Sequence, residues 1–134
     1  MTPFQLKIVT PDGIAFDGMA ESLSVRSTSG DLGILAGHTN LVAPLGMGRA
    51  TIVMDGQRRY AACIGGMVSV VDNQVRIVAT AFEWADQIDA DRAAASEQRA
   101  KQILADKNAS ATELTMAEAR LKRALIRQSV ANGK

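Results

Sequence analysis

The sequence predicts an α+β protein in which β-strands in the first part of the chain are followed by α-helices in the last part. All three prolines, all five aromatic residues and ten of the eleven glycines lie before residue 85. Apolar residues alternate with polar ones before that point and recur every three or four residues after it, which are the periods of strands and helices. Residues 85–134 instead carry 13 alanines. We therefore expect two domains, residues 1–84 and 85–134, with the change near Trp84.

The expected strands each show one apolar face. Asp55-Gly56 is the strongest hairpin signal, because a two-residue turn needs positive φ at both central positions. Many short strands with regular turns and no helix between them predict a β-sandwich or a barrel. The alternating segments are residues 4–8, 22–26 and 74–77, and the turn signals lie at residues 11–13, 29–31, 46–48, 55–56 and 72–73.

The first expected helix begins after Asp86, which has a capping side chain, and Asp89 adds negative charge to the first turn. The helical period continues to about residue 105 and is broken by residues 106–109. The apolar stripe of this helix consists of Ala93, Ala94, Ala95, Ala100 and Ile103.

The second expected helix begins at a capping box. Ser110 and Glu113 have the spacing at which each side chain reaches the backbone N–H of the other. The helix is expected to run to about Val130, and the short linker before it makes the two helices an antiparallel hairpin. Its apolar stripe consists of Leu114, Ala117, Leu121 and Leu125.

The expected hairpin has few large apolar side chains, because alanine supplies most of its stripe. Alanine buries little surface, so two such helices gain little free energy from packing on each other. We expect the hairpin to depend on the sandwich, a ligand or a partner, and to adopt more than one position.

Composition excludes several classes of protein. No apolar run approaches the roughly 18 residues needed to cross a bilayer, and the N-terminus lacks the regions of a signal peptide, so we expect a cytoplasmic protein. The net charge of +1 argues against duplex nucleic acid as a partner. The single cysteine, Cys63, stands among apolar residues and is expected to be an inert core thiol. His38, the one histidine, reads as a surface-loop residue, and no catalytic or metal-binding set is present.

Arginines in the helical part leave two interpretations open. Arg92 and Arg99 share one face of the first helix, and Arg120, Arg123 and Arg127 share a face of the second. Their guanidinium groups could converge on a polyanion, since arginine binds phosphate bidentately. Periodicity alone favours the simpler interpretation, in which they form a solvated face balanced by nearby acidic residues.

Four motifs occur in order and together resemble one protein family. They closely resemble the epsilon subunits of bacterial F-type ATP synthases over essentially the whole chain. Ala36 stands where a proline is usual in the family, and Met67 where phenylalanine is common. The motifs are Val9-Thr10-Pro11-Asp12-Gly13, Gly30-Asp31-Leu32-Gly33-Ile34-Leu35-Ala36-Gly37-His38, Gly65-Gly66-Met67 and Ile88-Asp89-Ala90-Asp91-Arg92-Ala93.

The resemblance implies a ten-stranded β-sandwich followed by the helical hairpin. The sandwich would dock on the gamma subunit and the ring of c subunits, as part of the rotor that couples proton flow to ATP synthesis. The hairpin would either fold onto the sandwich or extend along gamma toward the catalytic alpha and beta subunits, where it inhibits ATP hydrolysis. Asp31 and His38 would face the c ring. Such a protein is not an enzyme by itself and lies at the cytoplasmic face of the inner membrane as a peripheral component.

The run from Ile88 to Ala93 also resembles the Ile/Leu-Asp-x-x-Arg-Ala motif through which some members bind ATP without hydrolysing it. By this resemblance ATP is a regulatory ligand, with or without magnesium, and no covalent cofactor is expected. Arginines would neutralise the phosphates, and Glu83 or Asp89 would accept from the adenine amine. Trp84 would either pack over the nucleotide or shield the hinge. The expected ATP-binding residues are Glu83, Ile88, Asp89, Arg92, Ala93, Arg99, Arg123 and Arg127.

A second function remains open beside the ATP sensor. In it the protein is a structural adapter of the rotor that inhibits by position alone and binds no nucleotide. The arginines would then meet acidic residues on the catalytic subunits.

Overall fold

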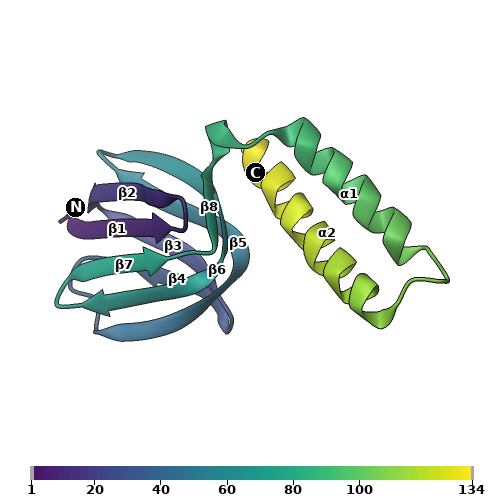
Figure 1. Ribbon diagram of the computed structural model, residues 1–134. Coiled ribbons are helices and arrows are strands. Elements are labelled where there is room, and N and C mark those ends of the chain that lie inside the picture. Colours follow the sequence, from purple (N-terminus) through teal and green to yellow (C-terminus); the bar gives the residue numbers. More distant parts are fainter. Residues whose placement is uncertain (1, 134) are drawn as a thin grey trace. The chain divides into compact units, whose positions relative to one another are not determined.

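The protein is described here by a computed structural model that covers residues 2–133. It divides into two units, Met1–Trp84 and Ala85–Lys134 (Figure 1). The first unit consists of strands and the second of helices, as composition and periodicity predict. No helix among the described residues is both long and apolar enough to cross a membrane.

The first unit is a sandwich of two strand layers. Its strands pair in the order β2-β1-β7-β6-β5-β3-β4, and β8 pairs with β6. All pairs are antiparallel except β1 with β7. The strands are β1 (Phe4–Thr10), β2 (Gly13–Ala20), β3 (Ser22–Ser27), β4 (Gly30–Ile34), β5 (Leu41–Met54), β6 (Gln57–Val71), β7 (Gln74–Val78) and β8 (Ala81–Trp84).

Two long strands pass through both layers. The part of β6 after Gly66 pairs with β7, whereas the part before Gly65 pairs with β8. Their mutual pairing is irregular between Leu45 and Met47 of β5, where the strands bend from one layer into the other. The structure therefore has eight strands among its described residues, where the family resemblance implies ten. The difference arises because β5 and β6, of 14 and 15 residues, are each continuous through the bend.

The sandwich core is built by the alternating residues that the sequence singles out. Phe4, Leu6 and Ile8 of β1 are buried, while Gln5 and Lys7 between them are half-buried. β3 and β7 show the same alternation, so each contributes one face to the core. The largest fully buried side chains here are Phe4, Leu6, Ile8, Leu23, Val25, Ile34, Ile52, Val68, Val70 and Ile77.

The hairpin turns confirm the predicted turn chemistry. Asp55 and Gly56, between β5 and β6, have φ of 52° and 74°. Asp72 and Asn73, between β6 and β7, have φ of 49° and 66°. Two consecutive positive φ values give the backbone twist that matches tightly connected antiparallel strands.

Cys63 lies in β6 and is 3% exposed, as expected of a core thiol. Burial raises its pKa to about 11, so the thiol stays protonated at neutral pH. Because the thiolate is the reactive form, we expect the native protein to resist alkylation by iodoacetamide at pH 8 and to react once it is unfolded. Mass spectrometry of the timed reaction measures this, and rapid alkylation under native conditions would contradict the burial of Cys63.

The second unit consists of a short 3₁₀ helix, η1 (Ala85–Gln87), and two α-helices, α1 (Ala90–Leu104) and α2 (Ala111–Ala131). The cap of α1 is Asp89, whose side chain accepts a hydrogen bond from the backbone N–H of Arg92 at 3.0 Å. The expectation that Asp86 caps this helix is therefore wrong, because Asp86 lies inside η1. The capping box of Ser110 and Glu113 is confirmed, with both bonds at 3.1 Å.

The two helices contact each other through small side chains. The buried residues of α1 are Ala93 and Ala100, and Ala117 and Ala124 of α2 are buried at the same seven-residue interval. Ala95, by contrast, is exposed, so it does not belong to the stripe. Leu125 is also outside it, at 47% exposed, because its position is turned away from that of Ala124.

Candidate functional site

The hairpin has two flanks that differ in charge chemistry. Glu97 accepts a hydrogen bond from Gln128 Nε2 of α2 at 2.7 Å and forms an ion pair with Lys101 at 2.5 Å. Successive α-helical residues are turned by roughly 100°, so Glu97 and Arg99 fall on opposite sides of the line through Ala93 and Ala100. The opposite flank, which we call the arginine flank, carries Arg92 and Arg99 from α1 and Arg120, Arg123 and Arg127 from α2.

The register of the hairpin brings some of these arginines to one level. The bond between Glu97 and Gln128 fixes the antiparallel register, so Arg99 lies level with Ile126. Arg123 and Arg127 stand on either side of that level, one helical turn apart. Arg92 lies further along the same flank, toward the last turn of α2. The structure thus groups three of the expected phosphate-binding arginines at one height.

Most of these guanidinium groups are not engaged by the protein. Within residues 2–133, the side chains of Arg92, Arg99, Arg120 and Arg123 make no hydrogen bond or ion pair. Arg127 does have an interaction within the chain. Arg92 and Arg99 are exposed, and Arg123 is half-buried. Cationic groups held on two packed helices without carboxylate partners are suited to bind an anion.

The other expected ATP-binding residues occupy different settings. Asp89 serves as the cap of α1, and Ala93 is buried in that helix. Ile88 is half-buried between η1 and α1. Glu83 belongs to β8 of the first unit, where it pairs with Ala62. The region 2–133 contains no group of three or more side chains suited to hold a metal ion.

Glu97 gives the hairpin a pH-dependent link. Hydrogen bonds from Lys101 and Gln128 lower the pKa of Glu97 below its ordinary value of 4.5. A lowered folded pKa stabilises the hairpin above the unfolded value, and this contribution is lost as pH falls through the lowered value. We expect Glu97→Ala to lower the melting temperature at pH 7 and to have less effect near pH 3. Circular dichroism at 222 nm measures both melts; an equal effect at the two pH values would contradict this link.

The expected rotor-interface residues lie in different elements of the sandwich. Asp31 is in β4 and forms an exposed ion pair with Arg26 of β3 at 3.1 Å. His38 is in the loop between β4 and β5, and its Nδ1–H donates to the carbonyl oxygen of Thr39 at 2.8 Å. Their roles at an interface stay predictions.

Two asparagines that sequence reasoning missed hold the loop of His38. Asn73 Oδ1 accepts from the backbone N–H of Gly37 at 2.7 Å. Asn40 Oδ1 accepts from the backbone N–H of Asp72 at 2.9 Å. The loop between β4 and β5 is therefore fixed to the turn between β6 and β7. Only the turn signal at residues 72–73 could have drawn attention to one of them.

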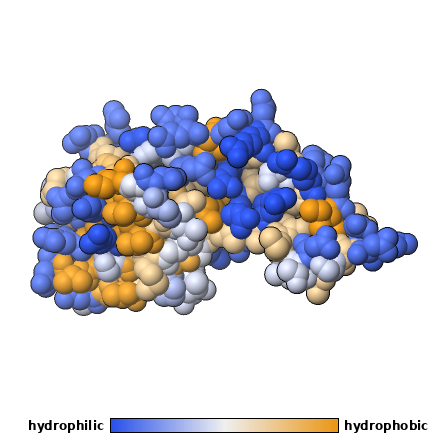
Figure 2. All heavy atoms as spheres, viewed as in Figure 1, coloured by the Kyte–Doolittle hydropathy of each residue, from blue (hydrophilic) through white to orange (hydrophobic). Residues whose placement is uncertain are grey.

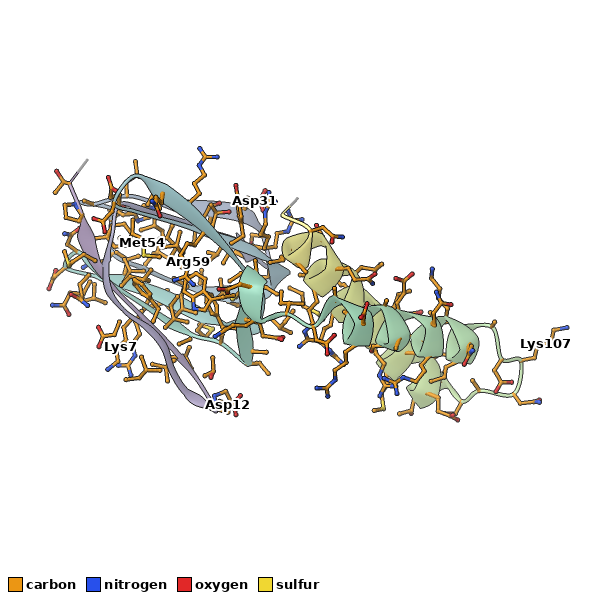
Figure 3. The ribbon with its side chains drawn as sticks, turned by 90° about the horizontal axis from the view of Figure 1, so that it is seen from above. Lys7, Asp12, Asp31, Met54, Arg59 and Lys107 are labelled. Atoms are coloured by element: carbon orange, nitrogen blue, oxygen red, sulfur yellow. The ribbon has the colours of Figure 1, made fainter. Side chains whose placement is uncertain are left out.

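Trp84, the last residue of β8, is enclosed by the sandwich. It is 6% exposed and contacts Phe82 and Phe16 edge to face, with ring centroids 5.1 and 6.1 Å away. The guanidinium carbon of Arg59 lies 3.8 Å from the centre of the ring, and Arg59 points into the space between the strand layers (Figure 3). Of the two interpretations of Trp84, these contacts favour shielding of the sandwich end over stacking on a nucleotide.

The enclosure of Trp84 predicts its fluorescence. We expect blue-shifted emission and weak quenching by acrylamide, because apolar side chains and Arg59 exclude water from the ring. Arg59→Ala is expected to increase the quenching constant at least about twofold by removing the cation–π contact. Arg58→Ala, one residue earlier and outward-facing, is the matched control. Equal quenching in the two variants would contradict the role of Arg59.

One outer face of the sandwich carries a continuous line of apolar residues. Strand register aligns Pro44 with Met67, Met67 with Val78, Val78 with Val9, and Val9 with Ile14. Met67, Val78 and Ile14 are 43%, 51% and 61% exposed. Strands lie about 4.8 Å apart, so this apolar row is roughly 19 Å long. Figure 2 shows apolar side chains gathered over β1, β6 and β7.

Comparisons with known proteins agree with the fold. The family described as ATP synthase, Delta/Epsilon chain, beta-sandwich domain matches residues 3–85. The ATP synthase epsilon chain of Bacillus pumilus is 45% identical over 131 residues, which is 98% of each chain.

Two solved assemblies contain chains of the same fold. One is the Euglena gracilis mitochondrial ATP synthase, OSCP/F1/c-ring, with a TM-score of 0.84, 19% identity and coverage of 96% of this chain and 81% of that chain. The other is the Tetrahymena thermophila mitochondrial ATP synthase, central stalk/c-ring, with a TM-score of 0.65, 16% identity and 95% coverage of each. The match over residues 3–85 and the full-length identity to a bacterial relative show that the chain belongs to the ATP synthase epsilon chain family.

Proposed function

We propose that the chain is a non-catalytic coupling and regulatory subunit of a proton-translocating ATP synthase. Its sandwich docks on the gamma subunit and the c ring, and its hairpin regulates ATP hydrolysis by the alpha and beta subunits. The complex holds it at the cytoplasmic face of the membrane as a peripheral component. Family membership and the fold shared with chains of two ATP synthase assemblies support this proposal.

The hairpin is, in this proposal, a sensor of ATP. The observation that carries it is the arginine flank, where Arg99, Arg123 and Arg127 share one level and Arg92 lies beyond them. A triphosphate carries several negative charges, and bidentate bonds from arginine match its geometry. ATP would join α1 to α2 across a contact that alanines alone keep thin. Glu83 or Asp89 would accept from the adenine amine in the ligand-bound arrangement.

A ligand of this kind regulates by shifting populations. If ATP binds one position of the hairpin and not another, it stabilises the bound position by RT ln(1 + [ATP]/Kd), about 2.7 kcal/mol at a hundredfold excess over Kd. High ATP would therefore keep the hairpin away from the catalytic subunits, and low ATP would release it to inhibit hydrolysis.

Thermal melting of the isolated chain with ATP tests this sensor. We expect millimolar ATP to raise the melting temperature, and Arg92→Ala with Arg123→Ala to abolish the rise. Lys122→Ala removes a positive charge from α2 outside the arginine flank and is expected to keep it. An unchanged melt of the wild-type chain, or an equal loss in the Lys122 variant, would reject the nucleotide site.

A structural adapter that binds no nucleotide is the second candidate. Met116 of α2 is 63% exposed and lies on the arginine flank, which favours a protein surface as the ligand of that flank. The arginines would then meet acidic residues on the catalytic subunits. Calorimetric titration distinguishes the two, since saturable heat on ATP addition is expected of the sensor alone.

A further inference from the structure

Two basic residues stand beside the apolar row. Lys7 of β1 and Arg76 of β7 are direct partners in the parallel register. Each lies two residues before a member of the row, Val9 or Val78, so all four side chains project from the same outer face about 7 Å apart along the strands. Figure 3 shows Lys7 on the outside of its strand layer.

The sandwich leaves this basic pair uncompensated. Neither side chain makes a hydrogen bond or ion pair with any residue from 2 to 133. Asp17 is the cross-strand neighbour of Lys7, but its Oδ1 accepts from Gln5 Nε2 at 2.9 Å. Ser69, the neighbour of Arg76 on the other side, is uncharged. Like charges directly opposite each other destabilise a sheet, so folding alone does not explain the pair.

We propose that the apolar row and the Lys7–Arg76 pair form one docking surface for an apolar segment that carries a carboxylate. This inference rests on the proposed function, because the partner is then a segment of the synthase stalk. The partner's apolar side chains would cover Met67, Val78 and Ile14. Its carboxylate would lie between Lys7 Nζ and the Arg76 guanidinium, where both cations strengthen the contact.

Charge selects this occupant over a second copy of the chain. The surface holds two cations and the single carboxylate of Asp17, which already accepts from Gln5. A symmetric dimer across the basic pair would place cations against cations. An acidic partner removes that repulsion and supplies the missing negative charge, so the pair sets the partner's register on the row.

Binding of the full-length chain to ATP synthase heads depleted of their epsilon subunit tests the surface. We expect Lys7→Glu with Arg76→Glu to weaken affinity about tenfold or more at low ionic strength, with a smaller loss at high ionic strength. Met67→Asp is expected to weaken binding at both. Arg58→Glu, an exposed charge reversal on the outer face of the other layer, is the matched control and stays within about twofold. Melting curves establish that each variant is folded.

The outcomes separate the inference from the proposed function. Unchanged affinity of the folded double variant at low ionic strength overturns the acidic partner, and a loss on Met67→Asp then still supports docking through the row. A loss equal to that of the Arg58 control also overturns it. Failure of the wild-type chain to bind the depleted heads rejects stalk docking itself.

Discussion

Gly66→Ala is expected to lower the free energy of unfolding of the sandwich by about 3 kcal/mol or more. Gly66 has φ of +112°, and a Cβ atom there would stand 2.0 Å from the carbonyl oxygen of Val78 and 2.7 Å from Cα of Ala79. Both are backbone atoms of the neighbouring segment, so neither can rotate away. Strain and overlap act together at the bend of β6, and chemical denaturation followed by tryptophan fluorescence measures the loss.

Gly33→Ala is the matched control for Gly66. Gly33 also lies in a strand, β4, but a Cβ atom there would meet nothing within 4 Å. We expect this variant to stay within about 0.5 kcal/mol of the wild type. If the two substitutions cost the same, then the close approach at Gly66 does not constrain the fold.

Ala100→Leu is expected to separate the helices of the hairpin at a cost of about 1–3 kcal/mol. Ala100 is fully buried in α1, where its methyl group leaves no room for three further carbons. Because α1 and α2 have little other apolar contact, they cannot repack around the larger side chain. Hydrogen exchange of the α1 amides, read by mass spectrometry, is expected to accelerate.

The same substitution at Ala95 controls for helix propensity. Ala95 is exposed on the same helix, so leucine there adds volume in solvent and costs at most about 0.5 kcal/mol. Equal acceleration of exchange in the two variants would contradict the alanine contact between the helices.

Local sequence predicts much of this fold because local chemistry decides it. Ser110 and Glu113 form their capping box from residues three apart, and positive φ at Asp55 follows from a two-residue turn. The start of α1 is different, since Asp86 and Asp89 both have capping side chains. The structure selects Asp89 because the intervening residues form a turn of 3₁₀ helix.

The candidate surfaces needed non-local information. Periodicity places Arg92 with Arg99 and Arg123 with Arg127, but only the bond of Glu97 to Gln128 sets the register between the helices. The apolar row depends on the alignment of five strands, and its members are far apart in sequence. Pairing of β1 with β7 in parallel, which brings Lys7 to Arg76, has no local signal at all.

The continuity of β5 and β6 has a mechanical consequence. A twisting load applied to one layer reaches the other along two covalent backbones, and it does not depend on side-chain contacts between the layers. Covalent chains stretch far less than packed interfaces slide. For a subunit that we propose turns with the stalk of a rotary synthase, the sandwich would therefore transmit torque as one stiff body, whichever of its faces the load enters.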